Sequence, residues 1–132
     1  MEYAATYIAT LVLFLSIDAV WIKTVMRPIF ERDIGTIMLA EPRMGAALAF
    51  FVLYLAGLIF FAVVPAVEDG SWKIAALYGS LLGVIAYGTY ETTNYATLKG
   101  WTLRMLVIDI LWGASLSAVM AVVGFFVLGS LA

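Results

Sequence analysis

Residues 103–128 read LRMLVIDILWGASLSAVMAVVGFFVL, a stretch with one acidic residue and, beyond Arg104, no basic residue. A helix needs about 20 predominantly apolar residues to cross the hydrocarbon core of a bilayer. This stretch is therefore predicted to be a transmembrane helix. Three further stretches have the same character, at residues 3–22, 44–65 and 74–96. The chain is expected to form a single domain, residues 1–132, with an all-α fold: an integral membrane bundle of four transmembrane helices.

The composition of the whole chain agrees with this assignment and excludes an ordinary soluble domain. Hydrophobic residues make up 65% of the 132 residues and charged residues 12%, whereas soluble domains are about 45–50% apolar and about 25% charged. The lipid bilayer is therefore the expected partner of the surface. The absence of cysteine and histidine excludes disulfides and the zinc or haem sites that use these ligands. No cofactor is expected, and the scattered basic residues indicate no nucleic-acid surface.

Basic residues are distributed unevenly between the two sides of the predicted bundle. Six of the seven flank the first and third connections: Lys23, Arg27, Arg32, Arg43, Lys99 and Arg104. The opposite side has only Lys73. Because cytoplasmic loops carry an excess of lysine and arginine, both termini are expected on the periplasmic side.

The connection between the first two spans is predicted to contain a short amphipathic helix at the membrane interface. Met26, Phe30, Ile34 and Met38 recur at every fourth position, which places them on one face of such a helix. Pro28 suits the first turn of this helix, where a missing N–H has no consequence. The alternative is an ordinary polar connector, because a glycine interrupts the pattern.

Three of the nine acidic residues, Asp18, Glu91 and Asp109, lie inside the predicted spans. A carboxylate there costs about 2.5–3.5 kcal/mol, so it is expected to face the bundle interior or a wet cavity. At 1.5 Å per residue, Asp18 and Asp109 lie about 7.5 Å, and Glu91 about 12 Å, from the nearest basic residue at the cytoplasmic end of the same span. All three acids are therefore expected at similar heights in the cytoplasmic half.

The third span ends in an unusually polar stretch, YGTYETTNYATLKGW, at residues 87–101. On a helix Tyr87 and Glu91 share one face, and this face is expected to point into the bundle. Gly79 and Gly83 continue the face as a small-residue strip. Such a strip would let a neighbouring helix, or a second copy in a homodimer, approach closely.

A short pattern occurs in both the first and the fourth span: IDAVW and IDILW, each with an aspartate followed three residues later by tryptophan. At this spacing an indole N–H could lie near the carboxylate of its own helix. Because the two spans run in opposite directions, Trp21 is expected to point toward the cytoplasmic interface, where it could belong to an aromatic belt, and Trp112 toward the membrane middle. Trp101, near a span end, is expected to be an interface anchor.

Three motifs carry a resemblance to known proteins: IDAVWI in the first span, YGTYETTNYATLKGW in the third and VIDILWG in the fourth. With these motifs nearly the whole chain resembles a family of small four-helix bacterial membrane proteins, domain of unknown function 2177. Members often have aspartate and leucine where this chain has Glu91 and Thr92, so the acid is kept and its length changes. The resemblance implies a multi-pass protein of the bacterial cytoplasmic (inner) membrane. It implies no activity and no catalytic residue.

Together these features predict a carboxylate-lined pocket within the membrane, open toward the cytoplasm, that binds or transports a small cation, a proton-coupled solute or a lipid headgroup. The expected ligand-binding residues come from three spans and are Asp18, Tyr87, Tyr90, Glu91, Asn94, Asp109 and Trp112. A second group that could add polar contacts is Trp21, Thr93 and Lys99. Aromatic walls suit organic cations, and no bound metal is required.

Two other functions are compatible with the sequence. A membrane-embedded enzyme acting on a lipid or isoprenoid could use paired carboxyl groups as general acid and base, but no nucleophile or catalytic motif supports it. A non-catalytic accessory or lipid-organising subunit would use the acids only to hold helices together. Serine or asparagine could do this without the cost of a charge, so binding or transport is favoured over both alternatives.

Overall fold

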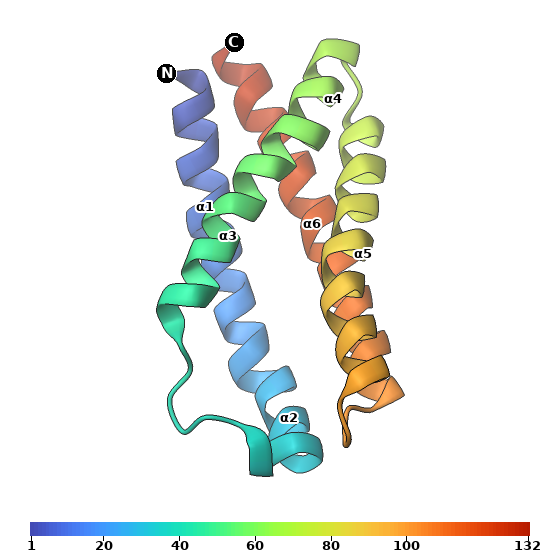
Figure 1. Ribbon diagram of the computed structural model, residues 1–132. Helices are drawn as coiled ribbons and strands as arrows, with labels where there is room; N and C mark the ends of the chain where they lie inside the picture. The colour runs from blue at the N-terminus through green and yellow to red at the C-terminus, as the bar shows by residue number, and fades with distance from the viewer.

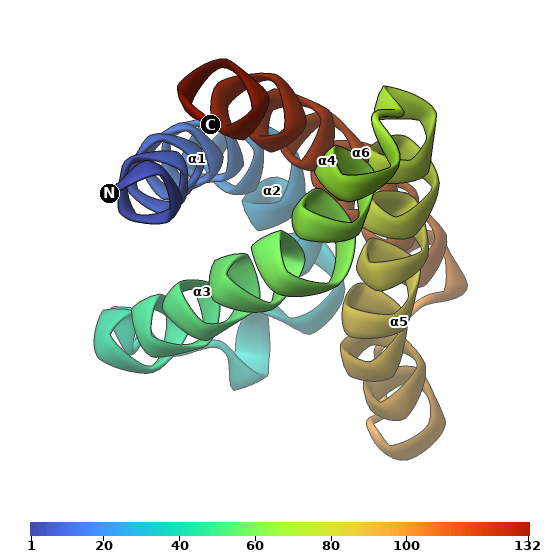
Figure 2. The ribbon, with the colours of Figure 1, turned by 90° about the horizontal axis from the view of Figure 1, so that it is seen from above.

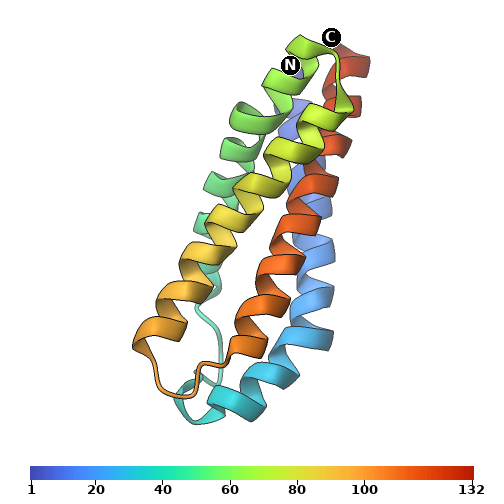
Figure 3. The ribbon, with the colours of Figure 1, turned by 90° about the vertical axis from the view of Figure 1, so that its right-hand side faces the viewer.

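The computed structural model describes all residues, 1–132, and consists of helices joined by short connections. The chain runs up and down as four rods, and both termini lie at the same end, here called the terminal end (Figure 1). The first rod joins α1 (Glu2–Trp21), η1 (Ile22–Met26), α2 (Arg27–Ile34) and η2 (Gly35–Ile37). The second joins α3 (Met44–Leu58), η3 (Ile59–Val63) and α4 (Val64–Asp69), and the others are α5 (Trp72–Thr97) and α6 (Leu103–Leu131). The opposite end of the bundle, here called the α2 end, holds α2 and the α5–α6 connection (Figure 3).

Three helical stretches are long and apolar enough to cross a membrane: Glu2–Ile37, Met44–Asp69 and Leu103–Leu131. α5 is not among them, although it has 26 residues. Large apolar side chains are exposed over much of the surface, with Leu53 and Phe60 about 70% accessible (72% and 68%). A soluble monomer rarely exposes so much apolar area. The prediction of an all-helical membrane protein is thus confirmed.

Two rods widen just before a proline. η1 and η3 are π-helical segments, and each ends two residues before a proline, Pro28 or Pro65. A proline ring collides with the carbonyl four residues earlier and offers no N–H, so the preceding turn adopts the wider spacing of a π-helix. Pro28 then lies in the first turn of α2, as predicted.

α2 is the helix predicted between the first two spans, but it continues directly from α1. Its expected apolar face is confirmed: Met26 and Ile34 are buried, and Phe30 and Met38 pack with them. This face meets protein and not lipid. It covers a small cluster at the α2 end that consists of Ile29, Ile34, Trp101 and Met105. The predicted location of this helix at the membrane interface stays a prediction.

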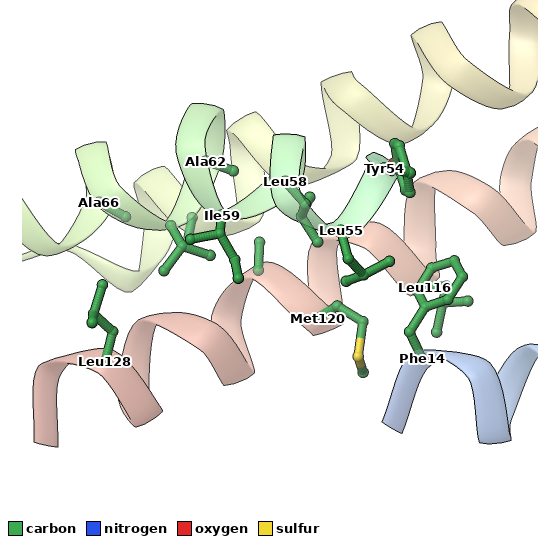
Figure 4. Packing of buried hydrophobic residues seen from close by; sticks show 13 residues of the cluster. Phe14, Tyr54, Leu55, Leu58, Ile59, Ala62, Ala66, Leu116, Met120 and Leu128 are labelled. Carbon is green, nitrogen blue, oxygen red and sulfur yellow. The ribbon is translucent and has the colours of Figure 1, made fainter. Parts of the chain in front are cut away.

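The main apolar core lies in the half of the bundle near the terminal end and joins all four rods (Figure 4). Phe14 of α1, Leu55 and Leu58 of α3 and Met120 of α6 are fully buried in it. At the lower edge of this core the Tyr54 hydroxyl and the Ser117 hydroxyl share a 2.6 Å hydrogen bond between α3 and α6.

α5 and α6 pack closely because glycines line their contact. A Cβ atom at Gly79 would lie 2.7 Å from the Ser117 carbonyl oxygen, and one at Gly83 would overlap the backbone of Gly113. The prediction that this strip admits a neighbouring helix is confirmed. Since α6 of the same chain occupies it, a second copy cannot use the strip, and the predicted homodimer contact through these two glycines is not supported.

α3 diverges from α5 toward the α2 end, as Figure 2 shows from above. The second rod contacts α5 mainly through η3 and α4. Every residue from Met44 to Phe50 is exposed. The first half of α3 is thus separated from the rest of the bundle, and a cavity lies beside it.

Candidate functional site

A cavity of about 520 Å³ lies between α1, α3, α5 and α6 in the half of the bundle toward the α2 end. Most of its wall is apolar or aromatic. The lining residues are Asp18, Ile22, Met26, Phe30, Ala47, Phe50, Phe51, Ala86, Tyr87, Thr89, Tyr90 and Asp109. Its volume falls within the range of about 300–1,000 Å³ that is usual for small-molecule sites.

Asp18 lies on the buried face of α1, one turn beyond Phe14. Its side chain is 4% exposed, and its Oδ1 accepts a 2.9 Å hydrogen bond from Nε1 of Trp112 on α6. The two ion pairs of the structure both lie on α2. Asp18, Glu91 and Asp109 therefore have no cationic partner within the chain.

The two aspartate–tryptophan patterns meet across the helices: Trp112 donates to Asp18 of the other helix, whereas Nε1 of Trp21 has no partner. α1 and α6 run antiparallel, so the register that sets Asp18 opposite Trp112 also sets Trp21 opposite Asp109. Side chains lean toward the N-terminus of their own helix, and the two indoles consequently lean toward each other. They stack with ring centroids 4.1 Å apart and planes 2° from parallel. The predictions of pairing within each helix, and of the two rings pointing apart, are both wrong.

Glu91 is fully buried and does not line the cavity. Its Oε1 accepts a 2.9 Å hydrogen bond from Nε1 of Trp101, while its Oε2 has no donor. The Asp109 carboxyl group lies next to Glu91. Trp101 is only 7% exposed, so its interpretation as an interface anchor is wrong.

Gly100 explains how Trp101 reaches Glu91. It adopts a left-handed backbone with φ of +84°, and a Cβ atom there would lie 3.1 Å from the Asp33 carbonyl oxygen. This turn, which favours glycine, brings the chain back beneath α5 and places the indole ten residues after its carboxyl partner. The sequence KGW contained the signal, because a glycine just after a helix marks a reversal of the chain.

The three acids form a row and not a single cluster. Asp109 lines the cavity together with Asp18, and Glu91 lies behind Asp109. No three acidic side chains come together in a way that could hold a metal ion. The cavity therefore exposes two of the three predicted acids.

The other residues of the predicted site fall into three groups. Tyr87 and Tyr90 line the cavity, and the buried hydroxyl of Tyr87 has no hydrogen-bond partner. Trp112 acts through Asp18, and Trp21 acts only by stacking on Trp112, because the buried Nε1 of Trp21 is unpaired. The remaining three, which do not line the cavity, are the half-buried Asn94 and the exposed Thr93 and Lys99.

Both ends of the cavity are covered. Toward the terminal end, Tyr54 packs on Phe14 and Tyr87 with ring centroids 6.1 Å and 6.4 Å away. Toward the α2 end, the buried Met26 and the half-buried Phe30 line the wall, and the Phe30 ring packs on Trp101 with centroids 5.6 Å apart. The predicted opening toward the first and third connections is thus filled by α2.

Four of the five exposed lining residues lie on the two helices that diverge, and the fifth is Ile22 of η1. Ala47 and Phe50 of α3 and Thr89 and Tyr90 of α5 are exposed, whereas Asp18 and Asp109 at the inner wall are buried. The mouth of the cavity therefore lies between α3 and α5, on the side of the bundle.

Comparison with known proteins places the chain in a family. A search of the curated proteins and a search of the solved structures each gave no match. Residues 3–126 match the family described as "Predicted membrane protein (DUF2177)", in agreement with the resemblance seen in the sequence motifs. The match covers nearly the whole chain, and the protein therefore belongs to this family of predicted membrane proteins.

Proposed function

We propose that this protein binds a small organic cation in the cavity between α1, α3, α5 and α6. The observation that supports the proposal most directly is the pair of carboxyl groups, Asp18 and Asp109, which lie in a mostly apolar wall without a cationic partner. A buried carboxylate is costly unless it is paired. A cation held between these two groups would supply the pairing.

The wall of the cavity favours an organic cation over a bare metal ion. Phe30, Phe50, Phe51 and Tyr90 line it with aromatic rings, whose faces attract ammonium groups at distances up to about 6 Å. A hard metal ion prefers six or more oxygen ligands, and this cavity offers no group of three acids. Its volume of about 520 Å³ also suits a molecule with an apolar body.

The proposal takes the protein as a four-span protein of the bacterial cytoplasmic membrane, with both termini periplasmic. α5 has 26 residues, about 39 Å at 1.5 Å per residue, which exceeds the thickness of the hydrocarbon core. The two termini lie at one end (Figure 1), as an even number of spans requires. Lys23 and Arg104 flank the α2 end, and this excess of basic residues favours the cytoplasm on that side.

Catalysis by an acid–base pair has less support. Glu91 and Asp109 are neighbours, but only Asp109 reaches the cavity. A substrate in the cavity would meet one carboxyl group of this pair, while Glu91 is engaged by Trp101.

Binding of tritiated tetraphenylphosphonium to the purified protein in nanodiscs tests the proposal. Asp18→Asn keeps an oxygen for the Trp112 hydrogen bond and removes only the charge, and Asp109→Asn does the same at the second group. Two opposite charges about 6 Å apart attract each other by about 2.8 kcal/mol at an effective dielectric constant of about 20, so each variant should bind more than tenfold more weakly. Asp69→Asn, exposed at the terminal end, is the matched control and should bind like the wild type. Unchanged affinity in the Asp18→Asn/Asp109→Asn double variant, with its fold intact by circular dichroism, would refute the proposed function.

A further inference from the structure

We infer that the ligand is a membrane-resident amphiphile with a net positive ammonium headgroup, which reaches the cavity sideways from the bilayer between α3 and α5. The inference rests on the proposed function and adds the class of ligand and its route. The headgroup would lie between Asp18 and Asp109, and the apolar chain would extend past Phe50 toward lipid.

The route follows from which sides of the cavity are closed. Tyr54, held by its hydrogen bond to Ser117, closes the terminal end. Met26, 1% exposed, and Phe30 close the α2 end. Four of the five exposed lining residues, Ala47, Phe50, Thr89 and Tyr90, lie on the diverging halves of α3 and α5, and this side is therefore the widest exposed part of the wall.

The height of the mouth within the membrane determines whether lipid or bulk water lies outside it. Ala47 comes four residues after Arg43, and Phe50 seven residues after it, so they lie about 6 Å and about 10 Å along the helix from that basic flank. Asp18 lies about 7.5 Å from Lys23 by the same rise. The mouth and the carboxyl groups are therefore level with each other, at the depth where headgroups give way to acyl chains. Lipid and not bulk water borders the opening.

The polar atoms at the inner wall select the charge of the headgroup. Asp18 and Asp109 offer acceptor oxygens, and the buried Tyr87 hydroxyl beside them lacks any partner within the chain. An ammonium group matches this set, because it carries positive charge and its N–H groups donate. A zwitterionic phospholipid would bring its phosphate against two carboxyl groups. The site therefore favours an amphiphile without an anionic group.

The absence of native cysteines permits a clean test of the route. Ala47→Cys places a thiol at the mouth, and Ala49→Cys places one on the same exposed helix away from the cavity lining. Each variant is labelled with a bulky maleimide in nanodiscs, and displacement of tritiated tetraphenylphosphonium by dodecylamine is measured. The label at Ala47→Cys should weaken dodecylamine binding at least tenfold, and the label at Ala49→Cys should leave it unchanged. Equal effects of the two labels, or no effect of either, would overturn the lateral route.

A second arm tests the class of ligand. Dodecylamine, octylamine and tetramethylammonium compete with the same probe, and concentrations of the amines are expressed per bilayer lipid to remove the effect of partitioning. Dodecylamine should displace the probe at least tenfold more effectively than octylamine, and tetramethylammonium should not displace it. Equal displacement by all three would overturn the amphiphile while leaving the proposed cation site intact. If the wild type and the Asp18→Asn/Asp109→Asn double variant bind the probe with equal affinity, the proposed function itself is refuted, and this inference with it.

Discussion

Replacement of Trp101 by phenylalanine removes the only hydrogen-bond donor of a fully buried carboxyl group. Nε1 of Trp101 lies 2.9 Å from Oε1 of Glu91, and Oε2 already lacks a donor. Phenylalanine keeps an aromatic ring that can pack against Phe30 and Met105. The variant therefore isolates the loss of the hydrogen bond from most of the loss of packing.

The expected magnitude follows from burial and from the nature of the acceptor. Hydrogen bonds between membrane helices contribute about 0.6 kcal/mol on average and reach about 1.7 kcal/mol. A carboxyl acceptor that is 0% exposed belongs near the upper end, because no water can replace the lost donor. We expect Trp101→Phe to lower the free energy of unfolding by about 1.5 kcal/mol.

A double-mutant cycle in detergent, with equilibrium unfolding by SDS, measures the contribution of this hydrogen bond to the free energy of unfolding. Glu91→Met removes the acceptor and keeps an unbranched chain of similar length. In that background Trp101→Phe should cost less than about 0.5 kcal/mol, which gives a coupling free energy near 1 kcal/mol. Trp72→Phe, half exposed near the terminal end, is the control and should change stability by less than about 0.5 kcal/mol. Additive effects of the two variants would show that the hydrogen bond contributes nothing.

Three further predictions concern the contacts between rods. Gly83→Ala should destabilise the protein by about 1–3 kcal/mol, because its methyl group would overlap the facing carbonyl of α6; Gly129→Ala, which meets nothing, should be neutral in the same SDS unfolding assay. Trp112→Phe should abolish the exciton couplet in circular dichroism that arises from its stacking on Trp21, and a spectrum identical to wild type would refute the stack. Thr102→Ala should cost about 1 kcal/mol in thermal or SDS unfolding, since it removes the N-cap of α6 and the 3.0 Å hydrogen bond from Thr102 to Oδ2 of Asp33 on α2.

The sequence was sufficient to predict those features of the fold that repeat along a single helix. Apolar runs of about 20 residues located the rods, and the spacing of Met26, Phe30, Ile34 and Met38 located the buried face of α2. Such patterns are visible because a helix returns to the same face every three or four residues. The close approach at Gly83 followed for the same reason.

Features that depend on the register between rods were not predictable from spacing within a rod. Trp112 donates to Asp18 and not to Asp109, because the antiparallel register of α1 and α6 decides which groups face each other. The divergence of α3 had no sequence signal either. Its residues are apolar on every side, and in a bilayer an apolar face suits lipid and protein equally well.

The arrangement of the acids separates two roles that the sequence could not distinguish. Glu91 is sealed under Trp101 at the covered α2 end, so its hydrogen bond serves to hold the α5–α6 connection beneath α5. Asp18 and Asp109 instead face a cavity with aromatic walls.

If all three acids served only to join helices, each should meet a donor from another rod, as Asp18 does with Trp112. Asp109 has no such donor and is 8% exposed at the cavity wall. A carboxyl group placed beside a second one, without a donor and open to a cavity, is a poor device for stability. Its position is better explained by a positively charged molecule that occupies the cavity.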